Sequence, residues 1–311
     1  MAGSERVPHN RGHILWEADS GPSRMLLSSM DRWSTSILSD DGIDSPFFGP
    51  SQKNGKAKII SRQDGIVVGT SMIDYMLQIW AGELRCSWLC SDGRKVNAGD
   101  EIGNISGPVE ALLLFERSVL NILGFLSGIA TEAKKWSAIA PHQIACTRKT
   151  TWGLLDKWAV HMGGGMTHRL SRKDALMIKE NDLSNMSGSS RNENLNEFLK
   201  SVNYDDVGAF LEVEVQTPKE AIIAAFTWSE RRMIENLPRL VIMLDNFSPD
   251  KCKSVIEELE TANLRHHVFI EVSGGITYQT MEDWRLCGAD VISTSAINRG
   301  TAPMDLSMIF D

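Results

Sequence analysis

The stretch LVIMLDNFSP, residues 240–249, decides the fold of this 311-residue chain. Its first five residues are apolar without the alternation of a half-exposed strand, so they predict a strand that is buried on both faces. Asp245 and Asn246 end the strand, and Ser248 and Pro249 then supply an N-cap and a first-turn proline for a helix. A strand, a polar loop and a helix in this order are typical of a parallel α/β sheet.

The same pattern recurs along the second half of the chain. Short apolar runs that end in polar residues or glycine lie at 143–146, 175–178, 209–215, 240–244, 268–272 and 291–293. Amphipathic segments at 218–236, 249–263 and 278–287 lie between the later runs and predict helices. Six strands in about 170 residues predict an α/β barrel, with a doubly wound sheet as the alternative. In either fold, ligands bind at the carboxyl ends of the strands.

The first half of the chain has shorter elements. Residues 65–69 predict a strand, 71–81 a helix and 95–100 a turn between strands. A long helix begins near Pro108, since the apolar residues that follow keep helical spacing. The polar and mixed N-terminal residues predict a loosely ordered arm.

The composition argues against several classes of protein. The net charge of −8 argues against a nucleic-acid-binding protein, which needs a basic surface. We expect no membrane span and no secretory signal, because no run of about 18 apolar residues occurs and the N-terminus has no apolar core. Five scattered cysteines predict reduced thiols, and together these features predict a cytoplasmic enzyme.

One region departs from the acidic average. Residues 147–179 contain seven Lys or Arg residues and two Asp residues. A basic island in an acidic chain predicts a binding site for an anion. Polar residues also follow each later strand: Glu212 and Glu214, Asp245 and Asn246, 273–275, and 293–295. Taken singly, each of these is an ordinary loop end or turn, and none decides the function.

Taken in order, these segments resemble the quinolinate phosphoribosyltransferase family, the carboxylating nicotinate-nucleotide pyrophosphorylases, which are type II phosphoribosyltransferases. The resemblance extends from Val109 to near the C-terminus. The matching segments are Glu116-Arg117 with Asn121, 126–131, 147–151, 163–165 with His168-Arg169, 177–179 with Asn181, 212–214, 243–246 and 273–276.

The resemblance implies a fold and an activity. The fold is an N-terminal α/β sandwich domain joined to an incomplete, open α/β barrel. It divides the chain into a polar arm (1–24), the sandwich (25–130), the barrel (131–295) and a C-terminal segment that returns to the N-terminal domain (296–311). The implied activity is transfer of the phosphoribosyl group of phosphoribosyl pyrophosphate to quinolinate, with Mg²⁺. The products are nicotinate mononucleotide, pyrophosphate and CO₂, in NAD biosynthesis.

The resemblance also assigns roles to residues. The catalytic residues that it implies are Lys149, Lys179, Glu214 and Asp245. The substrate-binding residues that it implies are Arg117, Arg148, His168, Arg169, Ser273, Gly274, Gly275, Ser293 and Ser295. Glu214 and Asp245 would hold Mg²⁺ through the magnesium pyrophosphate group. The family works as a homodimer with shared active sites, in some members as a hexamer, and Arg117 would be lent by the partner subunit.

Several positions depart from the family pattern: Trp152, Leu155, Asp182 and Thr294-Ser295. Asp182 adds negative charge near the expected anion site, and Ser295 stands where a glycine is common. These departures leave open a related phosphoribosyltransferase with another acceptor, such as nicotinate or a molybdenum-operon-type substrate. A non-catalytic homologue is the third possibility. The principal cations and carboxylates are all present, which favours quinolinate.

Overall fold

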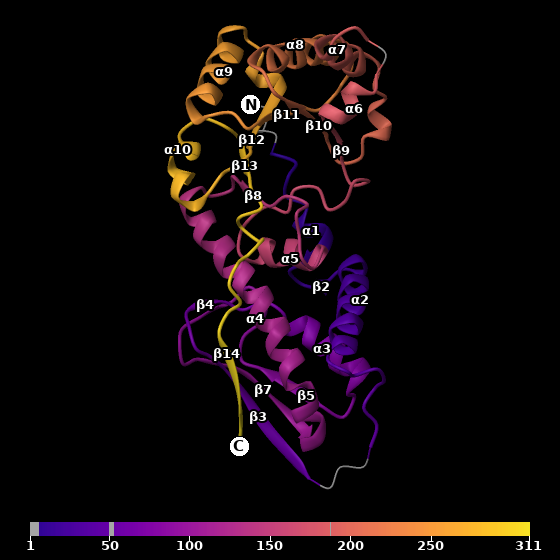
Figure 1. The fold of residues 1–311 in the computed structure, drawn as a ribbon, viewed down its shortest axis with the longest axis vertical. Helices are drawn as coiled ribbons and strands as arrows, with labels where there is room; N and C mark the ends of the chain where they lie inside the picture. Colours follow the sequence, from indigo (N-terminus) through magenta and orange to yellow (C-terminus); the bar gives the residue numbers. More distant parts are fainter. Residues whose placement is uncertain (1–5, 50–52, 187) are drawn as a thin grey trace. The chain divides into compact units, whose positions relative to one another are not determined.

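The computed structural model describes residues 6–49, 53–186 and 188–311, whose contacts divide the chain into two compact units (Figure 1). Unit 1 contains the described residues up to Arg11, together with Ile139–Arg148 and Met166–Ala296. Unit 2 contains Gly12–Ala138, Lys149–Gly165 and Ile297–Asp311. Each unit is therefore built from three separate stretches of chain.

Unit 1 is built on a six-stranded parallel sheet with the strand order β8-β13-β12-β11-β10-β9. Its strands are β8 (Ile144–Ala145), β9 (Leu176–Ile178), β10 (Leu211–Val215), β11 (Leu240–Asp245), β12 (Val268–Ser273) and β13 (Val291–Ser293). Each strand lies in one of the six predicted apolar runs or extends one residue beyond it. In the described part of the chain β8 and β9 form the two ends of the sheet, so the sheet is open. The predicted α/β class with an incomplete barrel is confirmed.

Helices alternate with the strands of unit 1. They are α6 (Glu180–Ser184), α7 (Arg191–Ser201), α8 (Pro218–Ile234), α9 (Pro249–Thr261) and α10 (Met281–Arg285), with short 3₁₀ turns η1 (Tyr204–Asp206), η2 (Arg265–His267) and η3 (Tyr278–Thr280). The two longest begin as predicted. The hydroxyls of Thr217 and Ser248 accept hydrogen bonds from the first-turn amides of Glu220 and Lys251, and a proline follows each cap.

Unit 2 contains an antiparallel sheet with the order β14-β3-β7-β5. Its strands are β3 (Asn54–Ser61), β5 (Arg85–Trp88), β7 (Glu101–Pro108) and β14 (Leu306–Phe310), and the smaller pairs are β1 (Trp16–Glu17) with β2 (Gly21–Pro22) and β4 (Gly65–Ile66) with β6 (Lys95–Val96). Its helices are α1 (Gly12–Leu15), α2 (Arg24–Asp40), α3 (Thr70–Trp80), α4 (Val109–Ile139) and α5 (Leu154–Met162). The C-terminal strand β14 completes the sheet by pairing with β3.

The long helix α4 is the central helix of unit 2. By length and composition alone α4 could cross a membrane, but 67% of its most apolar window is buried within the protein. Its polar side chains also form hydrogen bonds with backbone groups of unit 2. Thr131 Oγ1 accepts a hydrogen bond from the amide of Ile66, and Ser127 Oγ accepts one from the amide of Val68. The burial and these contacts are those of a core helix.

The division of the chain differs from the predicted boundaries in three places. Residues 149–165 belong to unit 2 rather than to the barrel, and so do residues 131–138 at the end of α4. The predicted loose arm is wrong for the described residues 6–24, because His9 and Leu15 are fully buried and 12–15 form a helix. Residues 1–5 of that arm lie outside the described residues.

Candidate active site at the carboxyl ends of the strands of unit 1

Polar side chains from neighbouring strands meet at one edge of the sheet of unit 1. Asp245 at the end of β11 lies opposite Ser273 of β12, which lies opposite Ser293 of β13. Lys179 directly follows β9, and its Nζ forms an ion pair with Glu214 of β10. Parallel strands bring their carboxyl ends to the same edge, so residues far apart in the sequence gather here.

Arg191 and Asp182 form hydrogen bonds with the backbone of the two residues of the Lys179–Glu214 ion pair. Arg191 Nη2 donates a hydrogen bond of 2.9 Å to the backbone carbonyl of Glu214, and Arg191 Nε lies 3.1 Å from the carboxylate of Glu220. The carboxylate of Asp182 accepts a hydrogen bond of 2.9 Å from the backbone amide of Lys179 at the start of α6. Asp182 therefore serves as part of a helix cap, which accounts for this departure from the family pattern. Arg191 was not among the predicted site residues.

Arg169 lies deeper in unit 1 than Lys179. Its guanidinium donates to the carbonyl of Ala175 at 3.2 Å and to the sulfur of Met177 at 3.2 Å, and the residue is 8% exposed. Burial lowers the pKa of Arg169, Glu212 opposes this, and the charge of Arg148 lowers it further.

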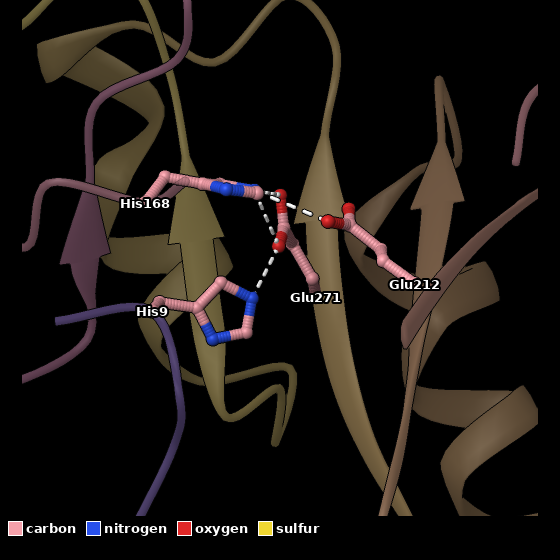
Figure 2. Close-up of side chains that lie close together, drawn as sticks. All are labelled: His9, His168, Glu212 and Glu271. Carbon is pink, nitrogen blue, oxygen red and sulfur yellow. Dashed lines mark hydrogen bonds and ion pairs between the residues drawn. The ribbon is translucent and has the colours of Figure 1, made fainter. Parts of the chain in front are cut away.

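Beneath this edge lies a group of four ionisable side chains, the buried quartet of His9, His168, Glu212 and Glu271 (Figure 2). His168 Nε2 lies 3.1 Å from Glu271 Oε2 and 3.5 Å from Glu212 Oε2, and His9 Nε2 lies 2.7 Å from Glu271 Oε2. None of the four is more than 3% exposed. His168 was predicted to be a substrate ligand, whereas its ring points toward two buried carboxylates.

The two carboxylates of the quartet differ in charge state. Burial raises the pKa of Glu212 well above its usual range, and the neighbouring charge of Glu271 raises it further. Burial acts on Glu271 in the same direction, but His168 and His9, whose rings face its carboxylate, outweigh burial and hold the pKa of Glu271 well below its usual range. Glu271 is therefore the ionised centre of the quartet.

Two of the four members were missed by the sequence analysis. Glu271 stands inside the apolar run 268–272, and an ionisable residue in a strand predicted to be buried was a usable signal. His9 gave no such signal, because it lies in a short polar segment far from the barrel in sequence.

The loop after β12 is tight and leaves its backbone accessible. Gly274 and Gly275 have φ angles of 102° and 63°, and Asn246 has a φ of 56°. A Cβ on Gly274 would lie 2.3 Å from Asn246 Oδ1, so only glycine fits there. Ser293 is 1% exposed, and its hydroxyl has no hydrogen-bond partner among the residues that the structure describes. Ser295 is half-buried on the loop that follows.

Of the remaining predicted residues, Arg148 is the last residue of the stretch Ile139–Arg148 of unit 1, and the others belong to unit 2. Arg148 is an exposed residue after β8, whereas Lys149 and Arg117 belong to unit 2 and are exposed there. The carbonyl of Lys149 accepts a hydrogen bond of 2.9 Å from Asn298 Nδ2, which also donates to Asp156 at 3.0 Å. The structure thus assembles Lys179, Glu214, Asp245, Ser273 and Ser293 in unit 1, and it places Lys149 and Arg117 in the other unit.

The two apolar departures near Lys149 are core residues of unit 2. The ring of Trp152 lies 4.1 Å from that of Phe125 and 5.8 Å from that of Trp33, measured between centroids. Leu155 is fully buried in α5. Both side chains therefore take part in the packing of unit 2.

Comparison with known proteins identifies the family. The model of the quinolinate phosphoribosyl transferase C-terminal domain matches residues 129–309, and that of the N-terminal domain matches residues 34–127. The chain is 32% identical over 260 residues to a probable carboxylating nicotinate-nucleotide pyrophosphorylase of Methanothermobacter thermautotrophicus, covering 81% of this chain and 87% of that protein. It is 32% identical over 270 residues to the chloroplastic enzyme of that name from Arabidopsis thaliana, covering 84% and 76%.

Solved structures agree with the sequence comparisons. The nicotinate-nucleotide pyrophosphorylase of Francisella tularensis superposes with a TM-score of 0.76 at 26% identity. The superposition covers 92% of this chain and 97% of that one. Both family models together span nearly the whole of units 1 and 2, and the matched regions include every residue of the strand-end site. The chain belongs to the quinolinate phosphoribosyltransferase family.

Proposed function

We propose that this chain transfers the phosphoribosyl group of phosphoribosyl pyrophosphate to quinolinate, with loss of CO₂, to give nicotinate mononucleotide and pyrophosphate for NAD biosynthesis. The observation that carries the proposal is the Lys179–Glu214 ion pair at the same strand edge as Asp245, in a chain of this family. This edge combines cations for an anionic acceptor with carboxylates for a cationic transition state.

The cations fit the acceptor. Quinolinate carries two adjacent carboxylates, which suit the planar guanidinium groups of Arg148 and Arg169 and the point charge of Lys179. His168 lies below this group, with its ring against Glu271, and we propose that it supports Arg169.

The carboxylates fit the donor. Departure of pyrophosphate from the ribose builds positive charge on the ring, and Glu214 and Asp245, on the neighbouring strands β10 and β11, would stabilise that charge. These two side chains would also hold Mg²⁺ with the pyrophosphate, since carboxylate and phosphate oxygens are its preferred ligands. When Mg²⁺ is bound, it would neutralise negative charge on the departing pyrophosphate.

The phosphate groups fit the glycine loop. Backbone amides in turns with positive φ angles can form concave sites for anions, and Gly274 and Gly275 offer two such amides directly after β12. The hydroxyls of Ser273, Ser293 and Ser295 add donors at or just beyond the ends of β12 and β13. We propose that this loop and these hydroxyls bind the phosphate groups of phosphoribosyl pyrophosphate.

The remaining catalytic parts belong to unit 2 and to a second subunit in this proposal. The active protein is a homodimer in which the partner subunit lends its Arg117 to each site. Lys149 follows Arg148 directly in the chain and would add a cation to the acceptor site. Both side chains are exposed in unit 2.

The test is turnover by the purified protein with quinolinate, phosphoribosyl pyrophosphate and Mg²⁺. We expect equal amounts of pyrophosphate and CO₂ and the appearance of nicotinate mononucleotide. Absence of all three products would refute the proposal. Turnover with nicotinate in place of quinolinate, without CO₂, would instead support a related acceptor; Asp182, which motivated that alternative, is engaged as a helix cap.

A further inference from the structure

The residues that precede α1 enter the interior of unit 1. Val7 packs against two buried apolar clusters, one containing Phe210, Val241 and Phe269 and the other containing Ala145. His9 is fully buried, and its ring lies 5.1 Å from that of Phe210 and 4.9 Å from that of His168. We call residues 6–11 the inserted segment. It fills the inside of the open sheet with side chains that the barrel strands do not supply.

The inserted segment contacts the loop that carries His168 and Arg169 on both sides of this pair. The amide of Arg11 donates to Thr167 Oγ1 at 2.9 Å, directly before His168. The guanidinium of Arg11 pairs with Asp174 at 3.0 Å, and Asp174 also accepts a hydrogen bond from the amide of Leu170. His9 reaches the ring of His168 itself through Glu271 (Figure 2).

The contacts of His168 fix which ring nitrogen carries the proton. The backbone amide of Arg169 donates a hydrogen bond of 2.7 Å to His168 Nδ1, so that nitrogen must offer a lone pair. The proton therefore resides on Nε2, which lies 3.2 Å from Glu271 Oε1 and donates to it. His9 Nε2 lies 2.7 Å from Oε2 of the same carboxylate, so Glu271 lies between the two imidazoles and contacts both.

The quartet also has the donor set of a transition-metal site, and its four ligand atoms lie within 4.8 Å of one another. Ligands about 2.0–2.1 Å from a tetrahedral Zn²⁺ lie roughly 3.3 Å apart, which these distances would allow. A metal on His168 Nε2 would need the proton to move to Nδ1, where the amide of Arg169 already points. The hydrogen bonds thus favour a protonated Nε2 over a metal ligand.

We propose that His9 is a positioning residue for substrate binding. Through Glu271 it holds the ring of His168, and so the adjoining Arg169, in the orientation that receives the acceptor's carboxylates. This inference rests on the proposed function, because it assigns the acceptor site to the His168–Arg169 pair. The new element is that a residue of the inserted segment, outside both the sheet and its loops, determines the affinity for the acceptor.

The test compares three variants in the full-length protein. His9→Leu removes the donor to Glu271, whereas His9→Gln keeps an N–H donor on a side chain of similar reach. His13→Leu is the matched control, since His13 is an exposed residue four positions along the chain. We expect His9→Leu to raise the KM for quinolinate about tenfold with little change in kcat or in the KM for phosphoribosyl pyrophosphate. His9→Gln should restore most of the affinity.

Several outcomes would overturn the inference. Equal effects of His9→Leu and His9→Gln, or a parallel rise of both KM values together with a fall in melting temperature, would show a purely structural role. Retention of one zinc ion per chain by the wild-type protein, with the same loss of affinity on its removal by a chelator, would make His9 a metal ligand.

A readout that does not need turnover separates this inference from the proposed function. The ¹⁵N NMR shifts of the imidazole of His168 should show the Nε2–H form in the wild-type protein and a changed ring environment in His9→Leu. An Nδ1–H form in the wild type would overturn the positioning role even in an active enzyme. A wild-type protein with the Nε2–H form but without turnover would refute the proposed function, and the positioning role with respect to quinolinate would fail with it.

Discussion

At the scale of single residues, charged side chains of the site are paired with other groups of the protein. Lys179 and Glu214 neutralise each other before substrate arrives, and Arg191 fixes the backbone of Glu214. An acidic acceptor bound near Lys179 would weaken this ion pair and leave Glu214 available for the positive charge that develops on the ribose. Binding of acceptor and stabilisation of the donor are therefore linked through one pair of side chains.

Replacement of Glu214 tests this link. We expect Glu214→Gln to lower kcat by about a hundredfold, because a neutral amide cannot stabilise the positive charge of the transition state. Glu197→Gln, an exposed change on α7, is the matched control and should leave kcat unaltered. Steady-state release of pyrophosphate measures both. A kcat for Glu214→Gln within threefold of the wild type would refute the assigned role.

A second residue-scale prediction concerns the glycine loop. Gly274→Ala should weaken binding of phosphoribosyl pyrophosphate by at least about tenfold, because its Cβ would strike Asn246 at 2.3 Å and displace the loop. Gly275→Ala should have a smaller effect, since a Cβ there meets no atom within 4 Å and only the strain of its φ of 63° remains. Calorimetric titration compares the two. Equal affinities for both variants would contradict the proposed phosphate loop.

At the scale of elements, caps determine where the helices of unit 1 begin. Ser248 accepts a hydrogen bond from the amide of Lys251 at the start of α9, and Pro249 has no amide proton to leave unpaired. This local arrangement returns the chain from Asp245, at the site, to the outside of the sheet. The residues that fix the position of Asp245 thus lie within a few positions of it in the sequence.

Ser248→Ala should lower the free energy of unfolding by about 1 kcal/mol, as the loss of a helix N-cap usually does. Ser254→Ala changes an exposed interior position of the same helix and should be neutral or slightly stabilising, since alanine favours helix. Urea unfolding measures both variants. Equal free energies for the two would show that the cap hydrogen bond adds nothing measurable to stability.

The elements also show what the sequence could reveal. Strands such as β11 and β12 were predictable because buried parallel strands are continuous apolar runs, and the residues after them followed from the shared edge. The insertion of His9 was not predictable, since it depends on a contact with Glu271 across 262 positions rather than on any local pattern. The predicted helix at 278–287 is shorter in the structure, where η3 precedes α10.

At the scale of the whole molecule, the proposed dimer makes a quantitative prediction. If Arg117 acts in the partner's site, a mixed dimer of Arg117→Ala and Glu214→Gln subunits contains one intact site and one site with both defects. Random mixing places half of all dimers in this class, so about a quarter of the wild-type activity should return when two inactive variants are mixed after dissociation. No recovery, with mixed dimers detected by mass spectrometry, would show that Arg117 serves its own subunit.

Because the chain alternates between the two units, some parts of the fold can form only after later residues have been synthesised. The chain passes between the units five times, after Arg11, Ala138, Arg148, Gly165 and Ala296. Strand β3 pairs on one side with β7 and on the other with β14, which ends one residue before the last residue of the sequence. During synthesis that side of β3 therefore stays without its native strand until residues 306–310 have been made. A ribosome stalled before residue 306 would expose an edge of the kind that recruits strands from other chains, so in this protein premature termination is a route to aggregation.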